Sequence, residues 1–147
     1  MFDITNLFEK LNNHFEGQLE LSEGGQAIYA KKQHVVQLLK LLKEKFNYTR
    51  LIDITSVDYE DCYEVVYHLI NNEMQLLAIK VKLQKDDNII PSIVSIWKAA
   101  DPQEREVYDL MGIVFEGHEN LTRILCPDDF VGHALLKSFK LDKVSRF

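Results

Sequence analysis

The sequence has no apolar run near the ~20 residues that a membrane-spanning helix requires. Cysteine is scarce, since Cys62 and Cys126 are too few for an iron–sulfur cluster, which usually takes four thiolates. Basic residues are outnumbered, 17 Lys and Arg against 23 Asp and Glu, and the net charge of −6 argues against nucleic-acid phosphates as a ligand. The N-terminus, MFDITNLFEK, lacks the build of a signal peptide. These absences indicate a cytoplasmic protein with two free thiols.

Catalytic motifs are scarce as well. The one glycine pair, Gly24-Gly25, makes no phosphate-binding loop, and no serine lies in a GxSxG turn. Neither cysteine has a recognisable histidine partner in the sequence. Nucleophilic catalysis is therefore poorly supported.

Two histidines follow glycine in similar frames, Phe115-Glu-Gly-His118 and Phe130-Val-Gly-His133. With Glu116, Cys126 and Asp128 they are conceivable metal ligands, but neither CxxC nor HExxH is present. Histidines that hydrogen-bond to the backbone in tight turns are the favoured alternative.

What the chain does have is the composition of one ordinary globular domain, 46% hydrophobic and 27% charged in 147 residues. Apolar residues at helical spacing from Ile4 to Phe15 predict a first helix. Short strand-like runs at 18–21 and 26–30 flank a Ser-Glu-Gly-Gly turn, which predicts a hairpin.

A second helix is predicted over residues 33–46, because its polar side chains gather on one face and the rest is mostly apolar. Residues 50–59, 62–70 and 76–83 then read as strands, and the last two alternate apolar and polar positions cleanly. A short Asn-Asn-Glu turn predicts that those two pair antiparallel. The polar helical positions are Gln33, Gln37, Lys40 and Glu44.

Residues 89–97 are a fourth strand candidate, in which Pro91 favours an edge or a strand start. The predicted fold class is α+β: a two-layer sandwich with a mostly antiparallel sheet, helices on one face, and an extended C-terminal segment.

A short helix is predicted over residues 102–111. Asp101 is expected to be its N-cap, Pro102 occupies the first position, and Gly112 stands where a C-terminal cap belongs. Little periodicity follows. We therefore expect a domain over residues 1–112 and an extended docking tail over 113–147, which must lie against something to be ordered.

The charged residues of this helix could pair with one another or take part in catalysis. Arg105 and Asp109 are four residues apart and can pair. Glu104 and Glu106 point to different sides of the helix, so a hydrolase with two converging carboxylates is a weak hypothesis. A tail that wraps a partner, or a simple solvated tail, remain the open alternatives.

Several stretches together resemble the 30 kDa subunit family of respiratory complex I. They are EREVYDLMGIVFEGH at 104–118, RIL at 123–125 and PDDFVGH at 127–133, preceded by LIDITSVDY at 51–59, EVVYHL at 64–69 and WKAA at 97–100. The resemblance covers nearly the whole domain, which makes it more specific than a lone motif.

The resemblance implies an accessory subunit with no cofactor of its own, on the cytoplasmic face of the cell membrane, where partner subunits supply the membrane contact. The implied partners are a hydrogenase-large-subunit-like (49 kDa-type) subunit and a small iron–sulfur subunit, which would hold a nickel–iron centre or quinone and the iron–sulfur clusters. The residues implied to fix the interface or the fold are Glu104, Arg105, Glu106, Asp109, His118, Arg123, Asp129, His133 and Lys137.

The chain departs from the family pattern in its tail. Glu119 follows the first Gly-His where members often have proline, and the run GHALLKSFKL at 132–141 lacks two prolines, an arginine and an aspartate of the family run. The chain also stops soon afterwards. These departures favour slightly the family's subunit in energy-converting (group 4 nickel–iron) membrane-bound hydrogenases, which pump ions, over the C subunit of NADH–quinone oxidoreductase. A free-standing enzyme and an unrelated binding module are the rivals.

Overall fold

The computed structural model describes residues 4–140. Its helices and strands follow one another along the chain in the order α1 (Ile4–His14), β1 (Glu20–Leu21), β2 (Ala27–Ala30), the 3₁₀ turn η1 (Lys32–His34), α2 (Val35–Lys45), β3 (Arg50–Asp58), β4 (Cys62–Ile70), β5 (Leu76–Gln84), β6 (Ile89–Pro91), α3 (Ala100–Met111) and β7 (Val114–Glu116). Both predicted N-terminal helices and the hairpin of β1 and β2 are confirmed.

The main sheet has the strand order β1-β2-β5-β4-β3, and three of its four neighbouring pairs are antiparallel. β4 and β5 pair in the register that their alternation predicts, with Tyr67 opposite Ile79 and Leu69 opposite Leu77. These side chains are buried because alternate residues of a strand point to one face. The mostly antiparallel α+β fold is confirmed.

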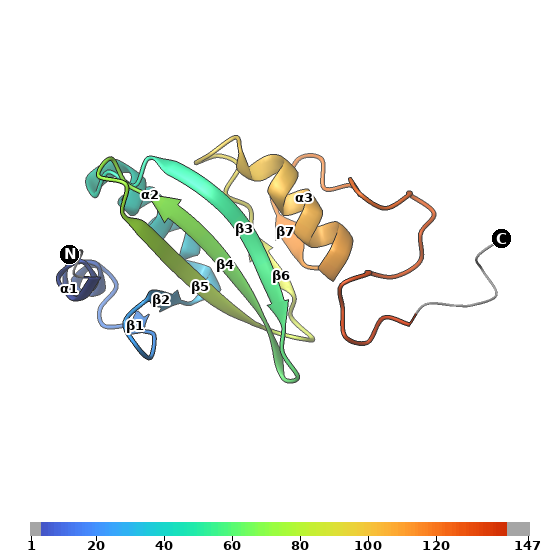
Figure 1. Cartoon of the computed structure of the whole chain (residues 1–147), viewed down its shortest axis with the longest axis horizontal. Helices are drawn as coiled ribbons and strands as arrows, with labels where there is room; N and C mark the ends of the chain where they lie inside the picture. Colours follow the sequence, from blue (N-terminus) through green and yellow to red (C-terminus); the bar gives the residue numbers. More distant parts are fainter. Residues whose placement is uncertain (1–3, 141–147) are drawn as a thin grey trace.

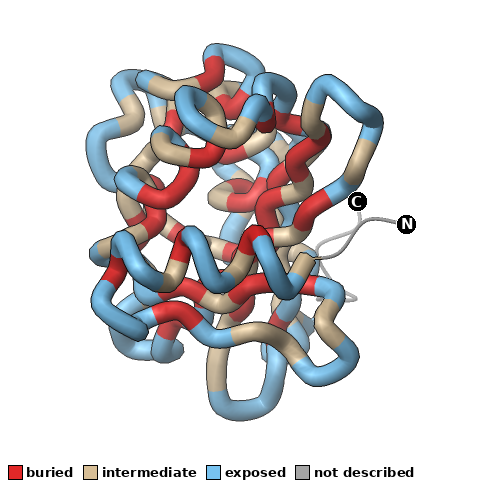
Figure 2. Tube along the Cα trace, turned by 90° about the vertical axis from the view of Figure 1, so that its left-hand side faces the viewer, coloured by how far each residue is buried: buried red, intermediate tan, exposed pale blue. Residues whose placement is uncertain are grey.

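The helices lie on the apolar face of this sheet. Figure 1 shows α2 behind β3, β4 and β5, and Leu38, Leu39 and Leu42 of α2 are fully buried there. The polar positions predicted for this helix are all exposed. Buried positions alternate with exposed ones along the trace, and the outermost turns are mostly exposed (Figure 2). One continuous apolar core therefore holds the sheet and the helices together.

The opposite face of the sheet is polar. His68 lies 2.6 Å from Asp53, and Lys80 lies 3.5 Å from Glu64. An antiparallel sheet can leave one face without a covering layer of helices, and on this face Glu64 and Val66 are buried by their neighbours. Within the described residues, no helix is both long enough and apolar enough to cross a membrane.

α3 protects the edge of the sheet. It lies beside β3, the last strand (Figure 1), and the side-chain amide of Gln103 donates to Ile52 O at 3.2 Å and accepts from Ile54 N at 2.8 Å. An uncovered edge strand offers unpaired N–H and C=O groups to other chains. Gln103 therefore takes the place of a neighbouring strand along part of β3.

The prediction for residues 89–97 is wrong in part. The strand β6 ends at Pro91 and does not join the main sheet, because it pairs in parallel with β7, a strand that the sequence did not predict. Tight turns follow, in which both Ile96 and Trp97 donate their backbone N–H to Ile93 O. Ile113 and Phe115 beside and within β7 are buried, so the start of the tail packs on the core.

The predicted start of the third helix is also wrong. α3 begins at Ala100, and Asp101 lies inside it rather than capping it. The preceding turn already supplies acceptors, since Ala100 N donates to Trp97 O and Asp101 N to Lys98 O. No orphan N–H then needs the Asp101 side chain. The predicted end is confirmed, because Gly112 adopts the left-handed conformation there, with φ of 76°.

Candidate functional site

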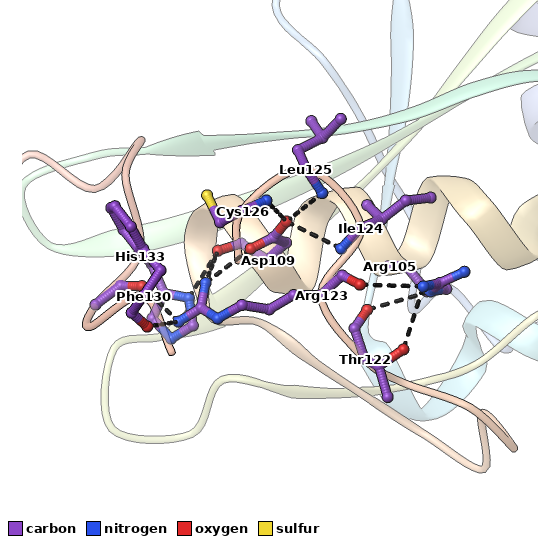
Figure 3. A network of polar contacts seen from close by, with 10 residues as sticks. Arg105, Asp109, Thr122, Arg123, Ile124, Leu125, Cys126, Phe130 and His133 are labelled. Carbon is purple, nitrogen blue, oxygen red and sulfur yellow. Dashed lines mark hydrogen bonds and ion pairs between the residues drawn. The ribbon is translucent and has the colours of Figure 1, made fainter. Parts of the chain in front are cut away.

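The candidate site is the contact between α3 and the tail, centred on Asp109. This carboxylate is fully buried, and its Oδ2 accepts hydrogen bonds from three consecutive N–H groups, those of Ile124 (3.1 Å), Leu125 (2.7 Å) and Cys126 (2.9 Å) (Figure 3). Successive backbone N–H groups that converge in this way form a concave site for negative charge. Asp109 therefore fixes the backbone of the tail at these three residues.

Arg123 neutralises the same carboxylate. Its Nη1 donates to Asp109 Oδ1 at 2.7 Å and to the backbone O of Asp109 at 3.1 Å. Its Nη2 donates to Phe130 O at 3.0 Å and to Gly132 O at 2.7 Å. A guanidinium presents several donors in one rigid plane. Arg123 thus joins α3 to two separate parts of the tail.

His133 closes the contact beyond Gly112. Its Nδ1 lies 2.9 Å from the Asp109 carbonyl oxygen, and its ring meets Tyr108 edge-on with centroids 5.9 Å apart. A Cβ at Gly112 would lie only 2.8 Å from His133 Cδ2. Glycine is therefore required here twice, for the left-handed turn and for the close approach of the histidine ring.

The pair that helical spacing allows between Arg105 and Asp109 does not form. Arg105 instead donates to the tail: Nε to Thr122 O at 3.2 Å, and Nη2 to Thr122 Oγ1 at 3.2 Å and to Arg123 O at 3.0 Å (Figure 3). Asp109 is saturated by Arg123 and the backbone, which is a better set of donors than a solvated helical neighbour. Both residues act between the helix and the tail rather than along the helix.

A second buried carboxylate, Asp58 at the end of β3, holds the far part of the tail. Its Oδ2 accepts from Lys137 N at 2.8 Å, and its other oxygen pairs with Lys85. Between the two anchors, Leu135 N donates to Leu110 O at 2.9 Å. The sequence offered no signal for Asp58, because its partner lies 79 positions away and contributes a backbone group.

Both anchoring carboxylates stay ionised. Burial alone opposes charge on Asp109, but hydrogen bonds from Cys126 N, the Arg123 guanidinium and the neighbouring amides hold its pKa well below the usual range. Burial is likewise outweighed at Asp58, where the hydrogen bonds from Lys85 and Lys137 N lower the pKa. Each carboxylate therefore binds the tail as a charged acceptor at neutral pH.

Two other predicted residues fix the fold around α3. The Glu104 carboxylate is buried, accepts from Ser92 Oγ at 2.6 Å and Ile93 N at 2.8 Å, and has its pKa raised by burial. His118 Nε2 lies 3.0 Å from Asp101 Oδ1, and His118 Nδ1 accepts from Asn120 N at 3.0 Å. Since Nδ1 accepts, Nε2 carries the proton toward Asp101.

The side chains of the remaining predicted residues are not drawn into this network. Glu106 and Asp129 are exposed, and neither side chain has a hydrogen bond or ion pair within residues 4–140. Lys137 contributes its backbone N–H, while its side chain is exposed. Over the same part of the chain, no group of three or more His, Cys, Asp or Glu is arranged to hold a metal ion. Cys62 and Cys126 are half-buried free thiols.

The fold and this contact define a class: an α+β domain whose tail is anchored to it by buried carboxylates. Residues 28–145 match the family described as "Respiratory-chain NADH dehydrogenase, 30 Kd subunit". A Moorella thermoacetica protein named as the C subunit of NADH-quinone oxidoreductase is 43% identical, covering 94% of this chain and 96% of that protein. A Geotalea uraniireducens protein of the same name is 37% identical, covering 93% and 88%. The chain belongs to this 30 kDa subunit family.

Chains of solved structures are similar as well, and two of them illustrate the fold. One, titled as the membrane-bound sulfane sulfur reductase, an archaeal respiratory membrane complex, contains a chain with a TM-score of 0.72 and 26% identity, covering 85% of this chain and 77% of that one. The other, a trypsin-resistant fragment of Nqo5, has a TM-score of 0.67 at 23% identity, covering 80% and 98%, and supports the fold alone.

Proposed function

We propose that this chain is a structural subunit of a complex-I-like membrane oxidoreductase and that its tail docks on a neighbouring subunit. One observation carries the docking role. The tail backbone is held by buried polar groups, yet several of its apolar side chains are exposed: the exposed fraction is 61% at Leu125, 89% at Val131 and 61% at Leu135. Apolar side chains held outward on a fixed backbone are what a protein interface needs.

The predicted site residues then divide into two groups. Asp109, Arg123 and His133 act as positioning residues, because they are buried or half-buried and their hydrogen bonds are made within the chain. Exposed Glu106 and Asp129 are free to meet polar groups of the partner around an apolar centre. This division explains the density of charge without any catalytic role.

The family supplies the proposed partners. A hydrogenase-large-subunit-like (49 kDa-type) subunit would receive the tail, and a small iron–sulfur subunit would lie in the same arm of the complex. The cofactors would then lie in these partners, and the subunit would be peripheral, on the cytoplasmic face of the membrane.

Both forms of the complex remain candidates. The relatives named as C subunits of NADH-quinone oxidoreductase support the quinone form. The Moorella thermoacetica protein of that name is matched over 96% of its own length, so the match is not limited to one part of it. The altered tail run, GHALLKSFKL, supports the hydrogenase form. Purification of the native complex decides between them. Nickel with hydrogen evolution identifies the hydrogenase, whereas bound quinone with NADH-dependent activity and no nickel excludes it.

The docking role is tested by charge insertion. Leu125→Asp and Val131→Asp should abolish co-purification of the partner subunits, because a charge would be buried at the apolar centre of the interface. Met74→Asp and Leu76→Asp are matched controls, since these residues are similarly exposed, at 69% and 63%, but lie at the turn between β4 and β5. Normal assembly of the tail variants would contradict the proposal.

A further inference from the structure

We propose that the tail, over residues 113–140, is already folded in the free subunit, latched at two points by the carboxylates of Asp109 and Asp58. This inference deepens the docking role proposed above, because it says in what state the docking surface meets its partner. The sequence suggests the opposite, since a tail without periodicity is expected to be disordered alone.

The two latches come from different elements and hold different parts of the tail. Asp109 on α3 receives the N–H groups of residues 124–126 together with Arg123, and Asp58 at the end of β3 receives Lys137 N. All of these acceptors and donors belong to this chain. The contacts therefore require no partner subunit.

Apolar packing of the tail is limited beyond β7. There Phe130 stacks on Phe139 with centroids 5.7 Å apart, and Leu121 and Leu136 pack partly against the core. Leu125, Val131 and Leu135 are exposed. A segment with little buried apolar surface opens easily unless polar contacts hold it. Order in the tail should therefore depend on the two carboxylates.

A preformed tail changes how the partner binds. A disordered segment must lose its conformational freedom during binding, whereas a rigid surface has already lost it. The subunit should then associate without a folding step, as pre-organised interfaces do.

The test is hydrogen exchange on the full isolated chain. The amides of residues 124–126 should exchange at least about tenfold more slowly than in an unstructured peptide. Asp109→Asn should remove this protection while the amides of β4 and β5 keep theirs, which shows that the domain is still folded. Lys137→Pro removes the N–H that binds Asp58, so it should release residues near 137 and leave residues 124–126 protected.

Matched controls are exposed carboxylates without partners in the described chain. Glu106→Gln on the same helix and Asp129→Asn in the tail should leave all amides unchanged. Exchange of residues 124–126 at peptide rates in the unmodified chain would overturn the proposal, as would full protection in Asp109→Asn. Neither result depends on the partner, so failure of the latch and failure of the docking role, measured by co-purification, are separate outcomes.

Discussion

The sheet domain and the tail are held by different forces. In the domain, Tyr67, Ile79 and Leu39 belong to one continuous apolar core that buries whole side chains. In the tail, Asp109 and Arg123 hold the backbone, and many of the apolar side chains face outward. Burial stabilises in proportion to area and is not directional, whereas charged hydrogen bonds depend on geometry.

This difference predicts how far the effect of a substitution extends through the protein. A cavity in the core weakens every element that packs on it, so the domain loses stability as one unit. A broken tail contact has a limited cost, because the tail can leave the domain and solvate its groups in water. The predictions below measure how far the two regions are separate.

The largest effect is expected in the core. Leu39→Ala on α2 should lower the free energy of unfolding by about 2–5 kcal/mol, because it leaves a cavity among fully buried side chains. Denaturant unfolding followed by circular dichroism measures this loss. Leu76→Ala, at an exposed position, is the control and should change little. A small effect of Leu39→Ala would mean that the core is loosely packed.

A smaller effect is expected at the junction of the two regions. Gly112→Ala should cost about 1–3 kcal/mol of strain at a positive φ and should also displace His133. Gly24→Ala is the matched control, because Gly24 has a similar φ of 86° and nothing within 4 Å of its Cβ position. Limited proteolysis of the tail should rise only in Gly112→Ala. Equal tail cleavage in both variants would contradict the role of His133.

Acid should release the tail before it unfolds the domain. The pKa values of Asp109 and Asp58 are lowered when the tail is bound, so the bound state holds fewer protons than the released state. Their stabilisation is complete above the ordinary Asp pKa of about 3.9 and is lost as the pH falls below it.

Proteolysis and exchange from pH 7 to pH 2 measure this release. In Asp109→Asn, residues 124–126 should already be released at pH 7, while the contact of Asp58 with Lys137 N remains. Release of the tail well above pH 5 would contradict the assignment to these two groups.

The smallest effect is expected at the sheet edge. Gln103→Ala removes two hydrogen bonds to β3 and should cost only about 0.5–1.5 kcal/mol in total, because water can replace the partners at this partly exposed site. Thermal unfolding measures it, with exposed Gln37→Ala as the control. Light scattering should also show more self-association in Gln103→Ala, since the edge of β3 is then open. An unchanged scattering signal would show that α3 alone protects the edge.

Much of the fold could be predicted because local periodicity and burial agree. The alternation of Tyr67 and Leu69 with Ile79 and Leu77 is enough to indicate the register of β4 and β5, since a slip by one residue would turn these side chains to the polar face. The short strands β6 and β7 could not be found in this way, since a three-residue parallel pair has too little pattern to recognise.

The charged cluster could be recognised from the sequence, but the hydrogen-bond partners within it could not be predicted. Helical spacing suggests Arg105 as the partner of Asp109, but the tail brings in Arg123. No local sequence pattern predicts the contact between Asp58 and Lys137 N, because the two residues are 79 positions apart and the donor is a backbone group.

The sequence by itself determined the layers of this protein, since the period of the apolar residues selects helix or strand and the face that each one buries. Only the tertiary structure decided what Asp109 binds. Hydrogen bonds depend on distance and direction, and these arise when α3, β3 and the tail come together in space.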